Sequence, residues 1–192
     1  IGVVGKYTNL KDSYKSLNEA LIHGGIENSS KVEIKWINAE KINKKNIKDK
    51  LYNCDGVLVP GGFGVRGIGG KIEAIRYARE NNLPYFGICL GMQLAVIEIA
   101  RNVLRIKNAN SSEFNSKSKS VVGLMTEWVK NNTIIKRNIN SDKGGTMRLG
   151  SYKAKLKKNS KVFSIYKKNI ISERHRHRYE VNEKFISKFN KK

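Results

Sequence analysis

The sequence predicts an α/β domain with a mainly parallel central sheet, helices on both faces and a small antiparallel extension. In the first half, short apolar strands alternate with segments of helical spacing, which is typical of parallel sheets covered on both faces. In the second half, short strands follow one another with only polar loops between them, which favours antiparallel pairing. The 192 residues are enough for one domain with a core, so a single domain is expected over residues 1–192.

The first half contains the parallel part of the predicted sheet. Apolar runs and period-two alternation predict strands at residues 1–5, 31–37, 55–60 and 85–88. Apolar residues at helical spacing predict helices at residues 12–23, 71–80 and 90–101. Asp12 or Ser13 is expected to cap the first helix and Gly24-Gly25 to end it. The lysine-rich stretch after residue 37 is expected to form a weak helix at most.

The second half contains four shorter candidate strands. They lie at residues 121–125, 133–136, 152–156 and 174–181. In the last of them, Arg174, Arg176 and Arg178 fall on one face of an extended chain, and His175 and His177 fall on the other.

The chain is strongly basic, with 38 Lys and Arg against 16 Asp and Glu, a net charge of +22. A nucleic-acid partner would account for this charge. However, the excess is mostly lysine, is spread over several segments and is not interleaved with stacking aromatic residues. We interpret it as a solvated surface and expect no nucleic-acid partner.

Neither a membrane span nor a signal peptide is recognisable in the sequence, so no membrane association is expected. The two cysteines, Cys54 and Cys89, form no CxxC pair, which excludes a disulfide framework and disfavours a metal site. A reducing cytoplasm fits this cysteine usage. Because the chain starts with Ile1, we expect that it begins inside a longer polypeptide or has been trimmed.

Glycine-rich turns follow two of the predicted strands, at residues 61–70 and 87–91, where parallel sheets carry their sites. Gly62, Gly64 and Gly67 match a G-x-G-x-x-G dinucleotide fingerprint. The next strand ends without the acidic residue that such a site needs, and the loop is too long. We interpret the loop as backbone that offers N–H groups to an anion or oxyanion.

The pattern Gly87-x-Cys89-x-Gly91 indicates a nucleophile elbow between a strand and a helix. The helix N-terminus favours a thiolate there, and the N–H of Leu90 is expected to form half of an oxyanion hole. A donor from the turn at Gly62 would form the other half. The alternative is a buried, inert cysteine. That alternative fits Cys54, whereas the flanking glycines favour a nucleophile at Cys89.

Several motifs together resemble a known family. Pro60-Gly-Gly and Gly87-Ile-Cys-Leu-Gly-Met-Gln93 resemble the class I, triad-type glutamine amidotransferases. Further segments are similar to the glutaminase domains of the CTP synthase family; they are residues 3–7, 23–25, 61–67, 108–114, 144–150 and 173–182. The resemblance covers essentially the whole chain and implies a flavodoxin-like core.

The resemblance also implies a mechanism, in which the Cys89 thiolate attacks the side-chain amide of glutamine to form a thioester. It implies oxyanion donors at Leu90 and Gly62 and no cofactor in this domain. Ammonia would pass to a synthase domain upstream of residue 1, where ATP and Mg²⁺ serve the amination of UTP to CTP. That domain would also assemble the protein into a homo-oligomer.

Further glutamine contacts are implied at Gly91, Met92, Gln93, Glu113 and Arg178, besides Gly62 and Leu90. Glu113 suits the α-ammonium group of the substrate, and Arg178 suits its α-carboxylate. Without the resemblance, Gln93 is open to interpretation as a surface helix residue, Glu113 as an ordinary loop acid, and the arginine run as a solvated strand. The segment 144–150 receives no role.

The sequence departs from the family at the general base. The His-Pro-Glu segment that completes the triad is absent, and the histidines are only His23, His175 and His177. The last two match substrate-binding positions, so neither is expected to be the base. We therefore expect a C-terminal truncation that removes the final strands and helix, leaving Cys89 reactive but turnover low. Alternatives are another class I amidotransferase and a non-catalytic glutamine-binding or interaction module.

Overall fold

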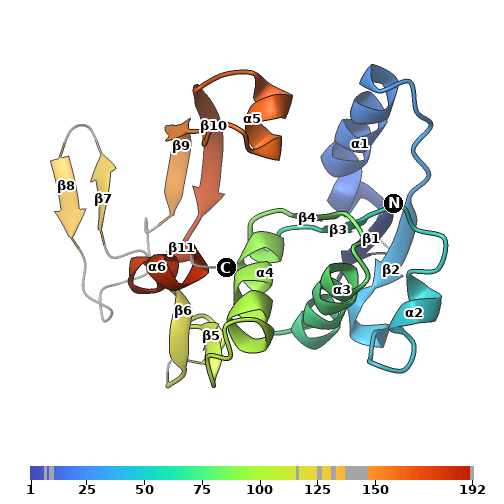
Figure 1. Ribbon diagram of the computed structural model, residues 1–192, viewed down its shortest axis with the longest axis horizontal. Coiled ribbons are helices and arrows are strands. Elements are labelled where there is room, and N and C mark those ends of the chain that lie inside the picture. Colours follow the sequence, from blue (N-terminus) through green and yellow to red (C-terminus); the bar gives the residue numbers. More distant parts are fainter. Residues whose placement is uncertain are drawn as a thin grey trace. The chain divides into compact units, whose positions relative to one another are not determined.

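The computed structural model describes residues 1–6, 8, 11–115, 117–124, 127–130, 133–136 and 147–190. The chain divides into two compact units, residues 1–123 with 181–192, and residues 124–180. Figure 1 shows the elements of each unit.

A four-stranded parallel sheet forms the centre of the first unit (Figure 1). Its strands β1 (Gly2–Gly5), β2 (Lys35–Asn38), β3 (Val57–Val59) and β4 (Tyr85–Gly87) lie in the order β2-β1-β3-β4. All three pairings are parallel, with Val3 opposite both Trp36 and Leu58. This is the strand order of a flavodoxin-like sheet, whose ligands bind beyond the carboxyl ends of the strands. The predicted fold class is confirmed.

The first helical region differs from its predicted boundaries at both ends. A 3-10 turn, η1 (Lys11–Tyr14), precedes α1 (Lys15–Glu27), and no side chain caps α1, so the predicted cap at Asp12 or Ser13 is wrong. The glycine pair at 24–25 lies inside α1 rather than ending it. A Cβ on Gly25 would lie 2.5 Å from Ser30 O, so this glycine lets the following chain fold back against the helix.

The lysine-rich stretch forms only short helical pieces, as expected. They are η2 (Ala39–Lys41) and α2 (Ile47–Lys50). The Asn38 side chain ends β2 and caps η2 by accepting a hydrogen bond of 2.8 Å from Glu40 N. Strand β2 is shorter than the predicted strand at 31–37 because residues 31–34 precede the ladder.

Helices α3 (Ile68–Glu80) and α4 (Leu90–Asn102) pack against the sheet and against each other. Helix α3 starts three residues earlier than predicted, because Gly67 stands at its N-cap with a left-handed φ of 72°. Gly70 therefore belongs to the helix, where an added Cβ would overlap the backbone of Ala39. A residue with a side chain at Gly70 would push the helix off this segment.

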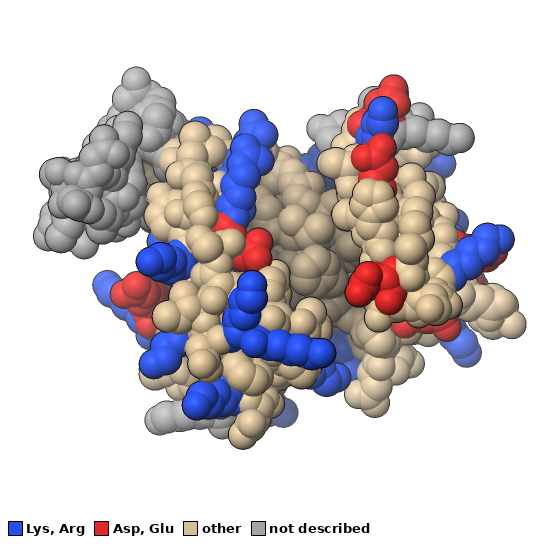
Figure 2. All heavy atoms as spheres, turned by 90° about the horizontal axis from the view of Figure 1, so that it is seen from above, with Lys and Arg blue, Asp and Glu red and all other residues tan. Residues whose placement is uncertain are grey.

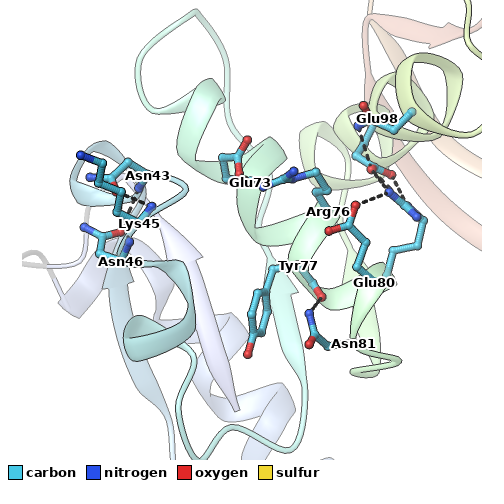
Figure 3. A network of polar contacts seen from close by, with 11 residues as sticks. Asn43, Lys45, Asn46, Glu73, Arg76, Tyr77, Glu80, Asn81 and Glu98 are labelled. Carbon is cyan, nitrogen blue, oxygen red and sulfur yellow. Dashed lines mark hydrogen bonds and ion pairs between the residues drawn. The ribbon is translucent and has the colours of Figure 1, made fainter.

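The contact between α3 and α4 includes a buried ion pair (Figure 3). The Glu98 side chain is fully buried on α4. Arg79 of α3 donates to both of its carboxylate oxygens, from Nε at 3.1 and 3.0 Å and from Nη2 at 2.8 Å. Asn102 Nδ2 donates a further hydrogen bond of 2.9 Å. The buried carboxylate is thus satisfied from several directions, which is the usual condition for burying a charge.

A smaller sheet and two short helical turns complete the first unit. Strand β5 (Ala109–Ser111) runs parallel to β6 (Lys119–Leu124), in the sheet order β11-β6-β5. The chain returns to this unit within β11 (Tyr179–Val181) and continues into η3 (Glu183–Phe185) and α6 (Ile186–Phe189). The polar triplet of β5 carries no strand pattern and was not predictable. Met125, the end of the predicted strand at 121–125, lies outside the described residues.

The second unit is antiparallel, as predicted. Strands β7 (Glu127–Lys130) and β8 (Thr133–Lys136) form one pair. Strands β9 (Arg148–Lys155) and β10 (Ile170–His177) form another, with α5 (Lys161–Tyr166) between them in the chain. Residues 144–146 of the segment 144–150 lie outside the described part.

The predicted strand at 174–181 is in fact two strands, because β10 ends at His177 and β11 begins at Tyr179. Within β10 the predicted alternation holds, with Arg174 and Arg176 exposed and His175 and His177 half-buried. Arg178 lies at the bend between the strands, so it does not share the ladder with the other two arginines.

Candidate active site

Cys89 stands on a sharp turn between β4 and α4. It is the N-cap residue of α4 and has φ 51° and ψ −106°. A residue with a side chain rarely adopts such a positive φ, and it costs on the order of 1–3 kcal/mol that the surroundings must offset. This is the conformation expected of a nucleophile elbow, which holds its side chain out beyond the strand end.

The glycines on either side of Cys89 are required by close packing. A Cβ on Gly87 would lie 2.6 Å from the backbone of Gly91 and Met92. A Cβ on Gly91 would overlap Val59 O of the neighbouring strand. The turn therefore folds because both positions lack side chains, which is the physical basis of the pattern recognised in the sequence.

The Cys89 sulfur is half-buried among groups with opposing influences. Burial is the largest of them and raises the pKa of the thiol. The backbone N–H groups of Leu90 and Gly62 reach the sulfur and lower its pKa, whereas the charge of Glu113 raises it and that of Lys71 lowers it. The structure thus brings both expected oxyanion donors to the cysteine.

The glycine-rich loop after β3 is tied down on two sides. Gly64 N donates a hydrogen bond of 2.8 Å to Glu113 Oε1, from the loop after β5. Lys6 Nζ, just beyond β1, donates to Phe63 O and, at 3.2 Å, to Gly64 O. The N–H of Gly64 is therefore already used by a carboxylate of the protein. These contacts place Glu113 and the loop at the same sheet end as Cys89.

The predicted glutamine contacts on α4 have different exposures. Gly91 is buried against β3, Met92 is 41% exposed, and Gln93 is only 3% exposed and has an interaction partner. Interpreting Gln93 as a surface helix residue is therefore wrong. Arg178 belongs to the second unit, where its Nε is buried without a hydrogen-bond partner in the described part of the chain. Its contact with substrate stays a prediction.

Two lysines that act at the site were not predicted from the sequence. Lys6 holds the glycine-rich loop, and Lys71 is fully buried with its charge acting on Cys89. The sequence did contain a signal for Lys71, because it shares the helical spacing of the buried residues Ala74, Ile75 and Ala78. A lysine on the apolar face of a helix indicates a buried charge that requires an explanation.

None of the three histidines lies in β4 or α4, the elements that carry Cys89. His23 lies exposed in α1. His175 and His177 lie in the second unit, where His175 Nδ1 and His177 Nε2 are 2.9 Å apart. Among the described groups that act on Cys89, no histidine occurs.

Three other features bear on function: clusters of metal-ligating side chains, membrane-spanning helices and surface charge. Across the described ranges, no set of three or more His, Cys, Asp or Glu side chains is arranged to hold a metal ion. Helices within those ranges are too short or too polar for a membrane crossing. On the face that Figure 2 shows, Lys and Arg side chains are spread over the surface with Asp and Glu side chains among them. The expected absence of a nucleic-acid partner stays a prediction.

Comparison with known proteins decides the family. The model of the glutamine amidotransferase class-I family matches residues 9–191. The chain belongs to the class I glutamine amidotransferases. It is 58% identical over 192 residues to the CTP synthase of Pelagibacter ubique, and 59% identical over 182 residues to that of Agrobacterium fabrum. These matches cover 100% and 95% of the chain but 36% and 34% of the relatives, so it spans about a third of their length.

A solved structure agrees with this family. The glutaminase domain of Trypanosoma brucei CTPS, with bound acivicin, is 39% identical and superimposes with a TM-score of 0.84. The match covers 99% of this chain and 70% of that one. The predicted resemblance to the glutaminase domains of CTP synthases is confirmed.

Proposed function

We propose that this chain is the glutaminase domain of a CTP synthase, in which Cys89 hydrolyses the side-chain amide of glutamine. The observation that carries the proposal is the strained Cys89 turn, with the N–H groups of Leu90 and Gly62 reaching its sulfur. A thiol held this way at a helix start is placed for nucleophilic attack, and the same two donors suit a developing oxyanion.

The hydrolysis of glutamine proceeds in two steps, formation of a thioester on Cys89 and its hydrolysis. The Cys89 thiolate forms a bond to the amide carbon, and the negative charge moves to the amide oxygen, which Leu90 and Gly62 stabilise. The C–N bond then breaks, and the amine leaves as ammonia after taking up a proton. Water adds to the resulting thioester, the C–S bond breaks, and glutamate leaves with restoration of the thiol.

The substrate is held by its amino-acid end. The Glu113 carboxylate, bonded to Gly64 N, faces the site and suits an α-ammonium group. For the α-carboxylate the family resemblance implies Arg178, whose planar guanidinium suits a two-pronged pair. Met92 is exposed on α4 near Cys89, and Gln93 is buried in the same helix. Both stay proposed contacts of the substrate.

The wider protein uses the ammonia. Its release would feed a synthase domain of the same polypeptide, which aminates UTP with ATP and Mg²⁺ and brings homo-oligomer assembly, in the cytoplasm. The support is the naming of the relatives as CTP synthases and the third of their length that the chain spans. No cofactor is required by the steps at Cys89.

Without a histidine among the described groups at Cys89, the 192-residue chain is expected to react but not to turn over. This same observation favours a second candidate, a glutamine-binding module without catalysis. The two candidates differ at Cys89, because only the first requires a nucleophilic thiol there.

Acivicin, an amino acid with an electrophilic chlorinated ring, tests the proposal on the 192-residue chain. Mass spectrometry should show one adduct on Cys89, which excess glutamine suppresses and Cys89→Ser abolishes, while Cys54→Ser leaves it intact. Ammonia release from glutamine should stay near background. Labelling that survives Cys89→Ser, or that glutamine does not suppress, would contradict the proposal. Rapid ammonia release would refute the expectation of low turnover.

A further inference from the structure

Lys71 is a buried charge without a visible structural reason. It lies in the second turn of α3, and its exposed fraction is 0%. Its Nζ has no hydrogen-bond partner among the described residues. An ammonium group buried in this way is costly, because it has lost water and gained no acceptor. Methionine or leucine would fill the same space beside Ala74 and Ile75 without that cost.

Two charged groups act on Lys71 from neighbouring elements. Lys6, beyond β1, repels it, and Cys89, beyond β4, attracts it when ionised. Burial is the main cause that lowers the pKa of Lys71 to about 8, and Lys6 adds to the effect. Lys6 is in turn influenced by burial and by Arg66, Glu113 and Glu40. The Cys89 thiolate is thus the one opposite charge among the described groups that act on Lys71.

The groups around Cys89 complete the electrostatic environment. The charge of Glu113 disfavours the Cys89 thiolate, and the charge of Lys71 favours that thiolate. The Tyr85 hydroxyl donates a hydrogen bond of 2.8 Å to Gly91 O at the start of α4. Burial raises the pKa of Tyr85, so this hydroxyl stays neutral and does not compete as an anion. Lys71 is therefore the side-chain cation that counteracts burial and Glu113 at the sulfur, as far as the described residues extend.

We propose that Lys71 is a positioning residue of the glutaminase site, whose buried positive charge stabilises the Cys89 thiolate. The inference rests on the proposed function, in which Cys89 is the nucleophile. Lys71 makes no contact with substrate, and acts through the cysteine. Since Lys71 loses its own proton as the pH rises past about 8, its help is greatest near neutral pH and fades above that range.

The test measures the pH dependence of Cys89 alkylation by iodoacetamide in the 192-residue chain carrying Cys54→Ser. Lys71→Met should slow the reaction about tenfold at neutral pH, where Lys71 is charged, and the difference should shrink above about pH 8, where Lys71 loses its proton. Glu113→Gln, which removes the opposing charge, should move the midpoint down. Lys48→Met, on an exposed lysine of α2, should leave the profile unchanged.

The outcomes separate an electrostatic role from packing and from the proposed function. An unchanged alkylation rate at neutral pH in Lys71→Met would overturn the proposal, as would loss of fold in both Lys71→Met and Lys71→Leu, because neutral residues of similar size should be tolerated. Iodoacetamide needs no glutamine site. A failure of acivicin labelling with a shifted iodoacetamide profile would therefore refute the glutaminase assignment while the coupling of Lys71 to Cys89 stands.

Discussion

The two ends of helix α3 bury charge in opposite ways. Near its C-terminal end, Arg79 and Asn102 satisfy the fully buried Glu98 with hydrogen bonds of 2.8 to 3.1 Å (Figure 3). Near its N-terminal end, the equally buried Lys71 has no acceptor among the described residues. The first arrangement is typical of a structural ion pair, and the second is typical of groups at functional sites.

This difference shows where the fold accepts a local loss of stability. A satisfied pair joins α3 to α4 and holds both helices on the sheet. The unsatisfied lysine lies at the sheet end where β1, β3 and β4 present the loop and Cys89. A fully buried lysine without an acceptor, whose charge acts on the strained cysteine, indicates a functional requirement there. Three substitutions along α3 test this contrast.

The largest expected effect is at the structural end. Arg79→Met should lower the free energy of unfolding by about 3 kcal/mol, because Glu98 is left buried with much of its pairing lost. Urea denaturation followed by circular dichroism measures it. The double variant Arg79→Met, Glu98→Leu should recover most of the loss, since no charge is then buried. A loss below about 1 kcal/mol in the single variant would argue against a structural pair.

Near the N-terminal end of α3, a substitution should raise the free energy of unfolding instead of lowering it. Lys71→Met should raise the free energy of unfolding by roughly 1–3 kcal/mol at neutral pH, because the variant no longer buries an unpaired cation. The pKa of Lys71 falls to about 8 in the fold from its ordinary value of 10.5. The cost is therefore complete below about pH 8. Between these values the unfolded chain binds more protons, so the stability of the unsubstituted chain rises with pH.

The advantage of Lys71→Met should therefore shrink as the pH is raised from 8 toward 10. Thermal denaturation of both chains across this range measures the difference. Arg79→Met serves as a control, because its loss should not follow the same pH dependence. A destabilised Lys71→Met, or an advantage that grows with pH, would show that Lys71 is a structural residue.

The smallest effect is expected between the two ends. Glu73 and Arg76 form a half-buried ion pair on α3 at 2.8 Å, with both side chains partly solvated (Figure 3). Glu73→Gln should cost only about 0.3–0.5 kcal/mol, and added salt should reduce even that cost. Urea denaturation at low and high salt checks this value. A cost comparable to that of Arg79→Met would mean that solvent exposure does not separate these pairs.

The sequence predicted the parallel sheet because apolar runs such as Val57–Val59 are strong local signals. It failed where tertiary contacts decide. The glycine pair at 24–25 continues α1, since Gly25 is needed for the returning chain rather than for a helix stop. Helix α3 begins at Ile68 because Gly67 and Gly70 meet η2, which no local pattern reveals.

The turn that carries Cys89 was predictable because its signal is local: the spacing of Gly87, Cys89 and Gly91 reflects backbone contacts around one short turn. The environment of the sulfur was not. Glu113 reaches the loop from a distant segment, and the charge of Lys71 acts on Cys89 only because α3 packs against β3 and α4. Interactions between segments remote in sequence require the structure.

The most direct test of the contrast along α3 is the titration of Cys89 itself. Thiolate absorbance in the ultraviolet, followed against pH in chains carrying Cys54→Ser, gives the thiolate fraction without any electrophile. Below about pH 8, where Lys71 is charged, the thiolate fraction of Lys71→Met should be lower than that of the unsubstituted chain, and that of Arg79→Met should be equal to it. Equal thiolate fractions in all three chains would contradict the account, because the buried lysine would then do nothing for the nucleophile.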